Sequence, residues 1–415
     1  MKKKILFALS LLLGITAVSV PAEAHTKYKR VAYFIQWGVY GRNYHVKDID
    51  VTGAAAKLTH LNYAFGFVNA EGTCYSSDPW ADWQRPVPAE QSVDGVADAP
   101  GQALNGNLNQ LLKLKAKHPH LKTLISLGGW TGSRWFSDAV LTPEGRTKLA
   151  QSCVDLWLRG NLPGLEPGAA AGVFDGIDLD WEWPGSSGHP DNVFRPEDKR
   201  NFTLFVEELR AQMRSYASGS LLSAFLPAAT AKIDAGFEVR RVFRALDFAT
   251  IQGYDLRGSW ELQTGHNGNL LTDRRDPNPV RYSVDQTVRD YLSRGAPARK
   301  IVVGVPAYGQ GWTGVKGGGD GLYKPADGPA PGKWGAGTED YKDLVTKPGK
   351  RYRDFRTGTM WLYDGNEFWS YDDPAVLMQK AAYIRLKGLG GSMMWSIDQD
   401  DAKASLTTAL YNVLR

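Results

Sequence analysis

Eight short apolar runs alternate with longer amphipathic stretches along this chain of 415 residues. The alternation is typical of strand-helix units that build a parallel sheet, because helices cover the strands and leave them buried. We expect strands at 31–37, 60–67, 122–128, 173–183, 221–227, 248–254, 301–308 and 391–397. Helical patterns follow them, for example at 104–118, 200–216 and 374–387. Eight such units predict an α/β fold of the (β/α)8 or TIM-barrel type, with functional residues at the carboxyl ends of the strands.

A doubly wound open sheet is the competing fold. It needs a glycine-rich phosphate loop after an early strand, and no G-x-G-x-x-G stands between an expected strand and an expected helix. Two regions break the regular spacing: residues 68–103 form a long polar loop, and residues 312–372 are rich in Gly, Pro, Trp and Tyr. We interpret 312–372 as a small α+β subdomain inserted between the seventh and the last strand of a barrel that covers 25–415.

The first 24 residues have the composition of a cleaved signal peptide. Three lysines precede an apolar run from Ile5 to Val20, and Ala22 and Ala24 supply the small residues that signal peptidase reads. A membrane anchor is the alternative, but the run is shorter than the roughly 20 residues that span a bilayer. The sequence therefore predicts a secreted, extracellular protein that does not act at a membrane.

Charge and cysteine content narrow the range of functions. Without the three Lys and one Glu of residues 1–24, the formal charge falls from +5 to +3, which is too weak and too scattered to indicate nucleic-acid binding. Cys74 and Cys153 are the two cysteines, and with no C-x-x-C pair they form neither a disulfide framework nor a zinc site. Whether these two cysteines pair stays open. We expect a monomer without a cofactor.

The aromatic content is high, with 14 Trp, 18 Tyr and 15 Phe residues, many of them beside Gly, Asp or Asn. Flat rings exposed in a groove suit the C–H faces of sugars. Core packing is the alternative for any single ring.

The stretch Asp175-Gly-Ile-Asp-Leu-Asp-Trp-Glu182 carries the strongest chemical signal. Side chains alternate along a strand, so Asp178, Asp180 and Glu182 are expected to point the same way, into the barrel and towards its mouth. Three buried carboxylates cannot all be ionised, so they need shared protons, and the pKa of at least one is raised. A calcium or magnesium site is the alternative, but alternate residues of one straight strand do not wrap a cation, so we expect no metal. Asp175 is three residues before Asp178, so its side chain is expected on the opposite face of the strand, where a structural role is as good an interpretation as a functional one.

This motif resembles that of the family 18 glycoside hydrolases, which carry D-x-x-D-x-D-x-E on the fourth barrel strand. The resemblance runs from Val31 to the C-terminus and includes the inserted subdomain. Further matching motifs are Ser126-Leu-Gly-Gly-Trp130 on the third strand, Tyr254-Asp255 on the sixth, Gly304-Val-Pro-Ala-Tyr308-Gly on the seventh and Met394-Trp395 on the eighth. The chain looks like bacterial chitinases with an α+β insertion, which implies hydrolysis of β-1,4 bonds between N-acetylglucosamine units of chitin and chitooligosaccharides.

The resemblance also implies roles for individual residues. In this family the acetamide of the substrate is the nucleophile, so Glu182 would act first as an acid and then as a base. Asp180 would hold the acetamide nitrogen, Asp178 would share a proton with Asp180, and Tyr254 would bind the acetamide oxygen. Substrate contacts are expected from Trp395 beneath the distorted sugar, from Trp130 on the leaving-group side, from Asp255, and from the wall residues Tyr33 and Tyr308.

Two positions depart from the common chitinases of the family. Gln252 stands where they have Met, two residues before the sixth-strand Tyr, and Gln310 stands where they have Arg. Both changes are expected to affect substrate positioning, so we count Gln252 among the substrate-binding residues.

Two other functions stay open at this point. A chitin-binding lectin of this fold would have lost the catalytic acid, whereas Glu182 is present. An endo-β-N-acetylglucosaminidase would use the same chemistry on N-glycans, but the insertion and the groove aromatics favour a long linear polymer. The fold alone does not separate these functions.

Overall fold

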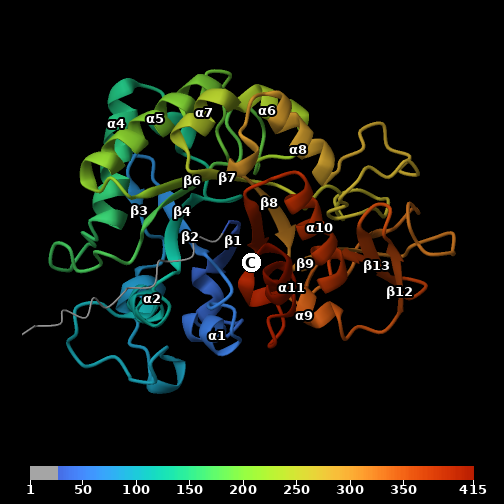
Figure 1. The fold of residues 1–415 in the computed structure, drawn as a ribbon, viewed down its shortest axis with the longest axis horizontal. Coiled ribbons are helices and arrows are strands. Elements are labelled where there is room, and N and C mark those ends of the chain that lie inside the picture. The colour runs from blue at the N-terminus through green and yellow to red at the C-terminus, as the bar shows by residue number, and fades with distance from the viewer. Residues whose placement is uncertain (1–26) are drawn as a thin grey trace, which may run out of the picture.

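The computed structural model describes residues 27–415, so the predicted signal peptide at 1–24 lies outside the described residues. Eight parallel strands close into a barrel, because β1 pairs with both β15 and β2 and the remaining strands pair in chain order. These strands are β1 (Lys29–Ile35), β2 (His60–Val68), β4 (Lys122–Gly128), β5 (Gly176–Asp180), β6 (Leu221–Leu226), β7 (Phe248–Ile251), β8 (Ile301–Pro306) and β15 (Gly391–Trp395). The structure confirms the predicted (β/α)8 fold (Figure 1).

The barrel strands are buried along almost their whole length, which explains their apolar sequences. Every residue of β5 and of β8 is buried. A strand that contacts helices on one face and the barrel interior on the other is stabilised by apolar side chains in both directions. Figure 1 shows α4, α5, α7, α6 and α8 following one another along the outside of the barrel.

The helices begin where the sequence supplies good caps. Thr142, Ser283 and Asp373 each accept a hydrogen bond from a backbone N–H three residues later, and proline follows Thr142 and Asp373 at the first helical position. The helices are α1 (Val46–Val51), α2 (Gly106–Lys117), α3 (Phe136–Ala139), α4 (Pro143–Cys153), α5 (Asp198–Tyr216), α6 (Thr230–Gly236), α7 (Val239–Ala245), α8 (Val284–Ser293), α9 (Tyr341–Leu344), α10 (Pro374–Leu386) and α11 (Ser405–Leu414).

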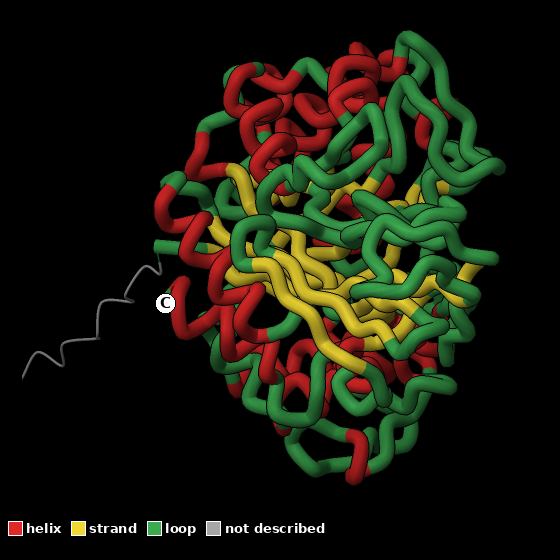
Figure 2. Tube along the Cα trace, turned by 90° about the vertical axis from the view of Figure 1, so that its right-hand side faces the viewer, coloured by secondary structure: helices red, strands yellow, loops and turns green. Residues whose placement is uncertain are grey.

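A second, antiparallel sheet is inserted between β8 and β15, as predicted. It contains β9 (Tyr308–Thr313), β10 (Gly328–Pro329), β11 (Thr338–Asp340), β12 (Lys350–Asp354), β13 (Thr359–Tyr363) and β14 (Phe368–Tyr371). A small core of its own, with Trp312, Trp361 and Phe368 at its centre, packs on this sheet. Figure 2 looks at the molecule from the side of the insertion and shows its strands in front of the barrel.

The long polar loop at 68–103 is fastened to the barrel. Its short strand β3 (Cys74–Tyr75) pairs with the end of β2. Cys74 forms a disulfide with Cys153 at the end of α4, which answers the question that the sequence left open. The loop thus has a covalent anchor on the outer helices.

Within residues 27–415, the helices are too short or too polar to cross a lipid bilayer.

Candidate active site

A cleft of about 1070 Å³ opens at the carboxyl ends of the barrel strands. Among the residues singled out from the sequence, those that line it are Trp130, Asp180, Glu182, Gln252, Tyr254, Asp255, Tyr308 and Trp395. They come from the ends of β4, β5, β7, β8 and β15, where a parallel barrel gathers side chains from distant parts of the chain. Asp178 and Tyr33 are fully buried and lie beneath the cleft rather than in its wall.

Asp178, Asp180 and Glu182 form a column of carboxyl groups, here called the carboxylate column, and Asp178 lies at its base. It accepts hydrogen bonds from Tyr33 Oη at 2.6 Å, Ser126 Oγ at 2.8 Å and Ser223 Oγ at 2.5 Å. Burial raises the pKa of Asp178, although these three donors favour the ionised form and oppose the shift. The hydroxyls come from β1, β4 and β6, so the ring of strands fixes this carboxyl in place.

Asp180 lies one layer above Asp178, at the end of β5. Its Oδ1 is buried and has no hydrogen-bond partner among residues 27–415. Burial, with the nearby charges of Glu182 and Asp178, raises the pKa of Asp180 well above its usual value. A buried acceptor without a partner costs roughly 1–3 kcal/mol, so this oxygen is available to a donor on a ligand.

Glu182 follows the strand rather than belonging to it, because β5 ends at Asp180 and not at residue 183 as expected. Its backbone N–H donates to Ser133 Oγ at 2.9 Å, and its carbonyl oxygen accepts from Asn192 Nδ2 at 2.9 Å. Burial and the negative charge of Asp255 raise the pKa of Glu182 to about 8, while the ammonium of Lys232 opposes the shift. The carboxyl therefore retains its proton near neutral pH.

The Gly-Gly pair in the third-strand motif permits a close approach of two strands. Gly128 has φ +112, and a Cβ at this position would lie 2.4 Å from the carbonyl oxygen of Asp180. That same oxygen accepts hydrogen bonds from Gly129 N at 2.8 Å and from Ser133 Oγ at 3.1 Å. The motif thereby fixes the backbone from which Asp180 and Glu182 project.

Asp255 follows β7, two strands along the barrel from β5, and is held by the insertion. Tyr308 Oη and Gln310 Nε2 donate to its Oδ1 at 2.7 and 2.8 Å. Its backbone is left-handed, with φ +53, and its N–H donates to Asn267 Oδ1 at 2.8 Å. The backbone N–H of Asn267 in turn donates a hydrogen bond to Ser370 Oγ on β14 at 2.9 Å. Gln310 therefore acts on the cleft indirectly, through Asp255.

Gln252 lies in the cleft wall, and its side chain is oriented by the backbone. Its Oε1 accepts a hydrogen bond from the N–H of Ala228 at 3.2 Å, and its amide nitrogen, which lines the cleft, has no acceptor among residues 27–415. A Met at this position would offer no such donor.

Three aromatic rings form a continuous stacked series in the cleft. Trp395 stacks on Phe65 with a centroid distance of 5.7 Å, and Phe65 stacks on Trp37 at 6.1 Å. Trp130 is 48% exposed and meets His189 edge-on. Flat, partly exposed rings are suited to sugar faces.

Several cleft residues were not singled out from the sequence. They are Trp37, Phe65, Trp183, Lys232, Arg257 and Trp260. Trp37 stood at the end of the first expected strand and could have been chosen by position, since strand ends gather at one rim. Trp260 and Arg257 lie in the β7–α8 loop, where no periodic pattern marks them.

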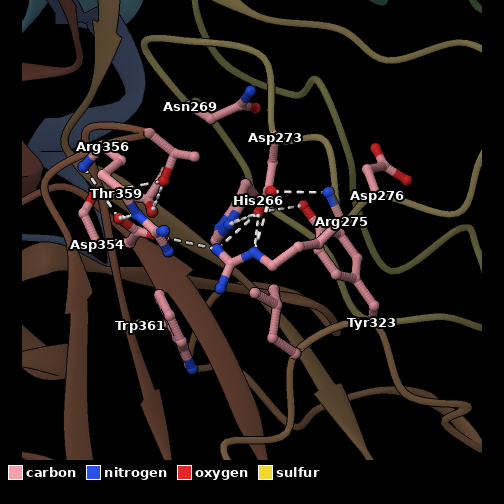
Figure 3. A network of polar contacts seen from close by, with 12 residues as sticks. His266, Asn269, Asp273, Arg275, Asp276, Tyr323, Asp354, Arg356, Thr359 and Trp361 are labelled. Atoms are coloured by element: carbon pink, nitrogen blue, oxygen red, sulfur yellow. Dashed lines mark hydrogen bonds and ion pairs between the residues drawn. The ribbon is translucent and has the colours of Figure 1, made fainter.

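The β7–α8 loop, residues 252–283, forms one wall and is fastened to the insertion. Arg275 bridges Asp273 in the loop and Asp354 on β12, at 2.8 and 2.7 Å. Tyr323 Oη donates to the same Asp273 carboxylate at 3.0 Å. Figure 3 shows this network converging on Asp273 and Arg275 between the loop and the sheet. These contacts hold the loop that carries Trp260 against the insertion.

Among residues 27–415, no group of three or more His, Cys, Asp or Glu side chains is arranged to hold a metal ion. The carboxylate column is instead surrounded by hydroxyl and aromatic groups.

The comparisons with known proteins agree with this geometry. The family model described as glycosyl hydrolases family 18 matches residues 29–400. The chain belongs to this family. Chitinase C of Streptomyces lividans is 38% identical over 378 residues, which cover 90% of this chain and 57% of that protein.

The solved structures that resemble this chain also include family 18 enzymes. The catalytic domain of the psychrophilic chitinase B from Arthrobacter TAD20 superposes with a TM-score of 0.91 at 44% identity, covering 94% of this chain and 96% of that one. A family 18 N-acetylglucosaminidase from Paenibacillus barengoltzii has a TM-score of 0.73 at 28% identity, covering 93% and 99%. The chain spans about three fifths of the length of the curated bacterial chitinases that it matches.

Proposed function

We propose that this protein is a chitinase, which hydrolyses the β-1,4 bonds between N-acetylglucosamine units of chitin with retention of configuration. The carboxylate column of Asp178, Asp180 and Glu182, which opens into a cleft lined by aromatic rings, is the observation that carries the proposal. The names of the relatives, Chitinase C and chitinase B among them, support the substrate.

Glu182 is the general acid in this proposal. Its pKa of about 8 keeps the carboxyl protonated at neutral pH, as proton donation to the bridging glycosidic oxygen requires. When that bond breaks, the proton stays on the leaving sugar. The resulting carboxylate then accepts a proton from the water that completes the reaction.

The acetamide of the substrate serves as the nucleophile. Its oxygen forms a bond to the anomeric carbon as the glycosidic bond breaks, giving a cyclic oxazolinium ion that water opens in the second step. The unpartnered Oδ1 of Asp180 is suited to accept the acetamide N–H and to balance the positive charge of that ion. Tyr254 would donate to the acetamide oxygen, and Asp178 would exchange a proton with Asp180.

The aromatic series supplies the binding surface. Trp395 would form the floor beneath the sugar that is cut, with Phe65 and Trp37 extending the floor along the polymer. Trp130, Asp255, Tyr308 and Gln252 would contact sugars around the cut.

The composition of the products tests this mechanism. A half-deacetylated chitosan is digested, and the sugars at the new reducing ends are sequenced. Because the acetamide attacks its own anomeric carbon, each new reducing end is expected to be N-acetylglucosamine. Frequent glucosamine at that end would require a nucleophile from the enzyme and would overturn the proposal. A digest of N-glycans in parallel tests the endo-β-N-acetylglucosaminidase alternative.

We also propose that the protein is secreted and works as a monomer. The disulfide between Cys74 and Cys153 supports secretion, since such bonds persist in oxidising compartments. Detection of the mature protein in culture medium, followed by a mass measurement in solution, tests both points.

A further inference from the structure

Lys232 places a positive charge in the cleft without an ionic partner. It lies on α6, directly after β6, and lines the cleft with Trp183 and Glu182. Its Nζ is 5.3 Å from the centre of the Trp183 ring. Among residues 27–415, no carboxylate lies within ion-pair distance of it. Burial lowers the pKa of Lys232, and the charge of Glu182 opposes this shift.

The other cation of the cleft wall is neutralised. Arg257 pairs with Glu261 at 3.1 Å and with Asp276 at 3.2 Å, so its guanidinium adds little net charge. Glu182, Asp180 and Asp255 line the same cleft, and Glu182 is the acid whose charge acts on Lys232. Burial raises the pKa of Glu182 to about 8, so this carboxyl keeps its proton near neutral pH and does not neutralise Lys232. The ammonium of Lys232 is therefore poorly compensated.

The strand order places Lys232 opposite the aromatic floor. In the closed barrel, β5 lies across from β15 and β6 lies across from β1, so Glu182 and Lys232 face the side that carries Trp395. Glu182 donates its proton to the oxygen that joins two sugars. In the proposed mechanism the sugar over Trp395 would keep the anomeric carbon, and the leaving sugar would lie on the Lys232 side of that oxygen.

We propose that Lys232 determines specificity for the leaving sugar, selecting N-acetylglucosamine there and rejecting glucosamine. This inference rests on the proposed chitinase function. An ammonium has three donors and no acceptor, so it can donate to the acetamide carbonyl oxygen of a neutral N-acetylglucosamine. Glucosamine lacks that acceptor and carries a positive charge of its own when protonated, which Lys232 repels. Attraction for one sugar and repulsion of the other add to a single preference.

The two ends of each product separate this inference from the proposed function. When half-deacetylated chitosan is cut, the new reducing end reports the sugar over Trp395, and the new non-reducing end reports the leaving sugar. Glucosamine at reducing ends would overturn the chitinase mechanism. Glucosamine at non-reducing ends at its frequency in the polymer would overturn the role of Lys232 alone.

The wild-type protein is expected to give at least about a fivefold excess of N-acetylglucosamine at non-reducing ends in 0.01 M salt. Part of that excess should disappear in 1 M salt, because the Debye length falls from about 30 Å to about 3 Å. An excess of the same size at both salt concentrations would show that charge repulsion does not contribute.

Variants at this position test the residue itself. Lys232→Gln should bring the sugar composition of the new non-reducing ends close to that of the polymer. Lys232→Glu should produce an excess of glucosamine at these ends, and Lys232→Arg should preserve the excess of N-acetylglucosamine. Lys117→Gln is the matched control, since Lys117 ends α2 just before the amino end of β4, at the face of the barrel opposite the cleft. An unchanged excess in Lys232→Gln, or an equal loss in Lys117→Gln, would overturn the inference.

Discussion

Trp395 and Phe65 stack with their ring centroids 5.7 Å apart and their planes inclined by 19°. The ring centroid of Tyr33 lies 5.2 Å from that of Trp395. The indole at the end of β15 thus packs against a ring on β2 and a ring on β1. This packing orients a flat surface in the cleft before any ligand arrives.

Removal of that surface should weaken binding and turnover together. Trp395→Ala is expected to lower kcat/KM at least about tenfold, a loss of about 1.4 kcal/mol, because a stacking platform stabilises both the bound substrate and the transition state. Steady-state kinetics on a soluble chitooligosaccharide give the measurement. Phe355→Ala, at a 64% exposed ring of the insertion outside the cleft lining, should leave both constants unchanged. Unaltered kinetics in Trp395→Ala would place this indole outside the substrate site.

Glu182→Gln should keep binding and abolish turnover. The amide fills the same space but has no proton acidic enough to transfer, so kcat should fall by a factor of about 10²–10⁴. Calorimetric titration with a chitin oligomer measures the binding that remains. If the variant fails to bind as well as to cleave, Glu182 has a structural role instead.

The pKa of Glu182 sets the alkaline limb of the pH profile. The acid must be protonated, so kcat/KM should fall about tenfold per pH unit above about pH 8. Asp255→Asn removes a negative charge that raises this pKa, and should move the limb to lower pH. Lys232→Gln removes a positive charge that lowers the pKa, and should move the limb to higher pH. Shifts in the same direction for both variants would contradict the electrostatic assignment.

The first product released should be the β-anomer. Attack by the acetamide inverts the anomeric carbon once, and attack by water inverts it again, so the original configuration returns. Chromatography of fresh products, before mutarotation, distinguishes the anomers. A predominance of the α-anomer would indicate a water molecule that attacks directly.

Loss of the disulfide should destabilise the fold more than it impairs catalysis. Cys74 and Cys153 are 79 residues apart in sequence, and closing a loop of that size contributes about 4.5 kcal/mol in the chain-entropy model. A Cys74→Ser, Cys153→Ser double variant should therefore show a lower free energy of unfolding in denaturant titrations, with kcat almost unchanged at low temperature. Equal stability with and without the bond would mean that the 68–103 loop is held by its other contacts.

The strands could be predicted because their apolar runs are fixed by burial on both faces. The expected range 122–128 coincides with β4, and 60–67 differs from β2 by one residue. The strand expected at 173–183 was too long at both ends, since β5 begins at Gly176 and ends at Asp180, where its last neighbour is Gly128. Hydrogen bonding to the adjacent strands ends a strand, and a sequence pattern does not show where those neighbours stop.

The candidate site could be predicted where motifs mark it and was missed elsewhere. Asp180 and Glu182 follow from one motif, whereas the depth of Tyr33 depends on how the barrel layers its side chains. Lys232 is one basic residue among 49 Lys and Arg, and its lack of a partner becomes visible once α6 is placed beside the cleft.

Tyr308 begins β9 only two residues after β8 ends, and with Gln310 on the same strand it holds the carboxylate of Asp255. The wall of the groove and the charge facing the catalytic acid therefore share one piece of backbone. Trimming the insertion to admit branched substrates would remove the donors that hold Asp255 and shift the proton affinity of Glu182. In this chain a wider groove and an unchanged pH range are competing design goals.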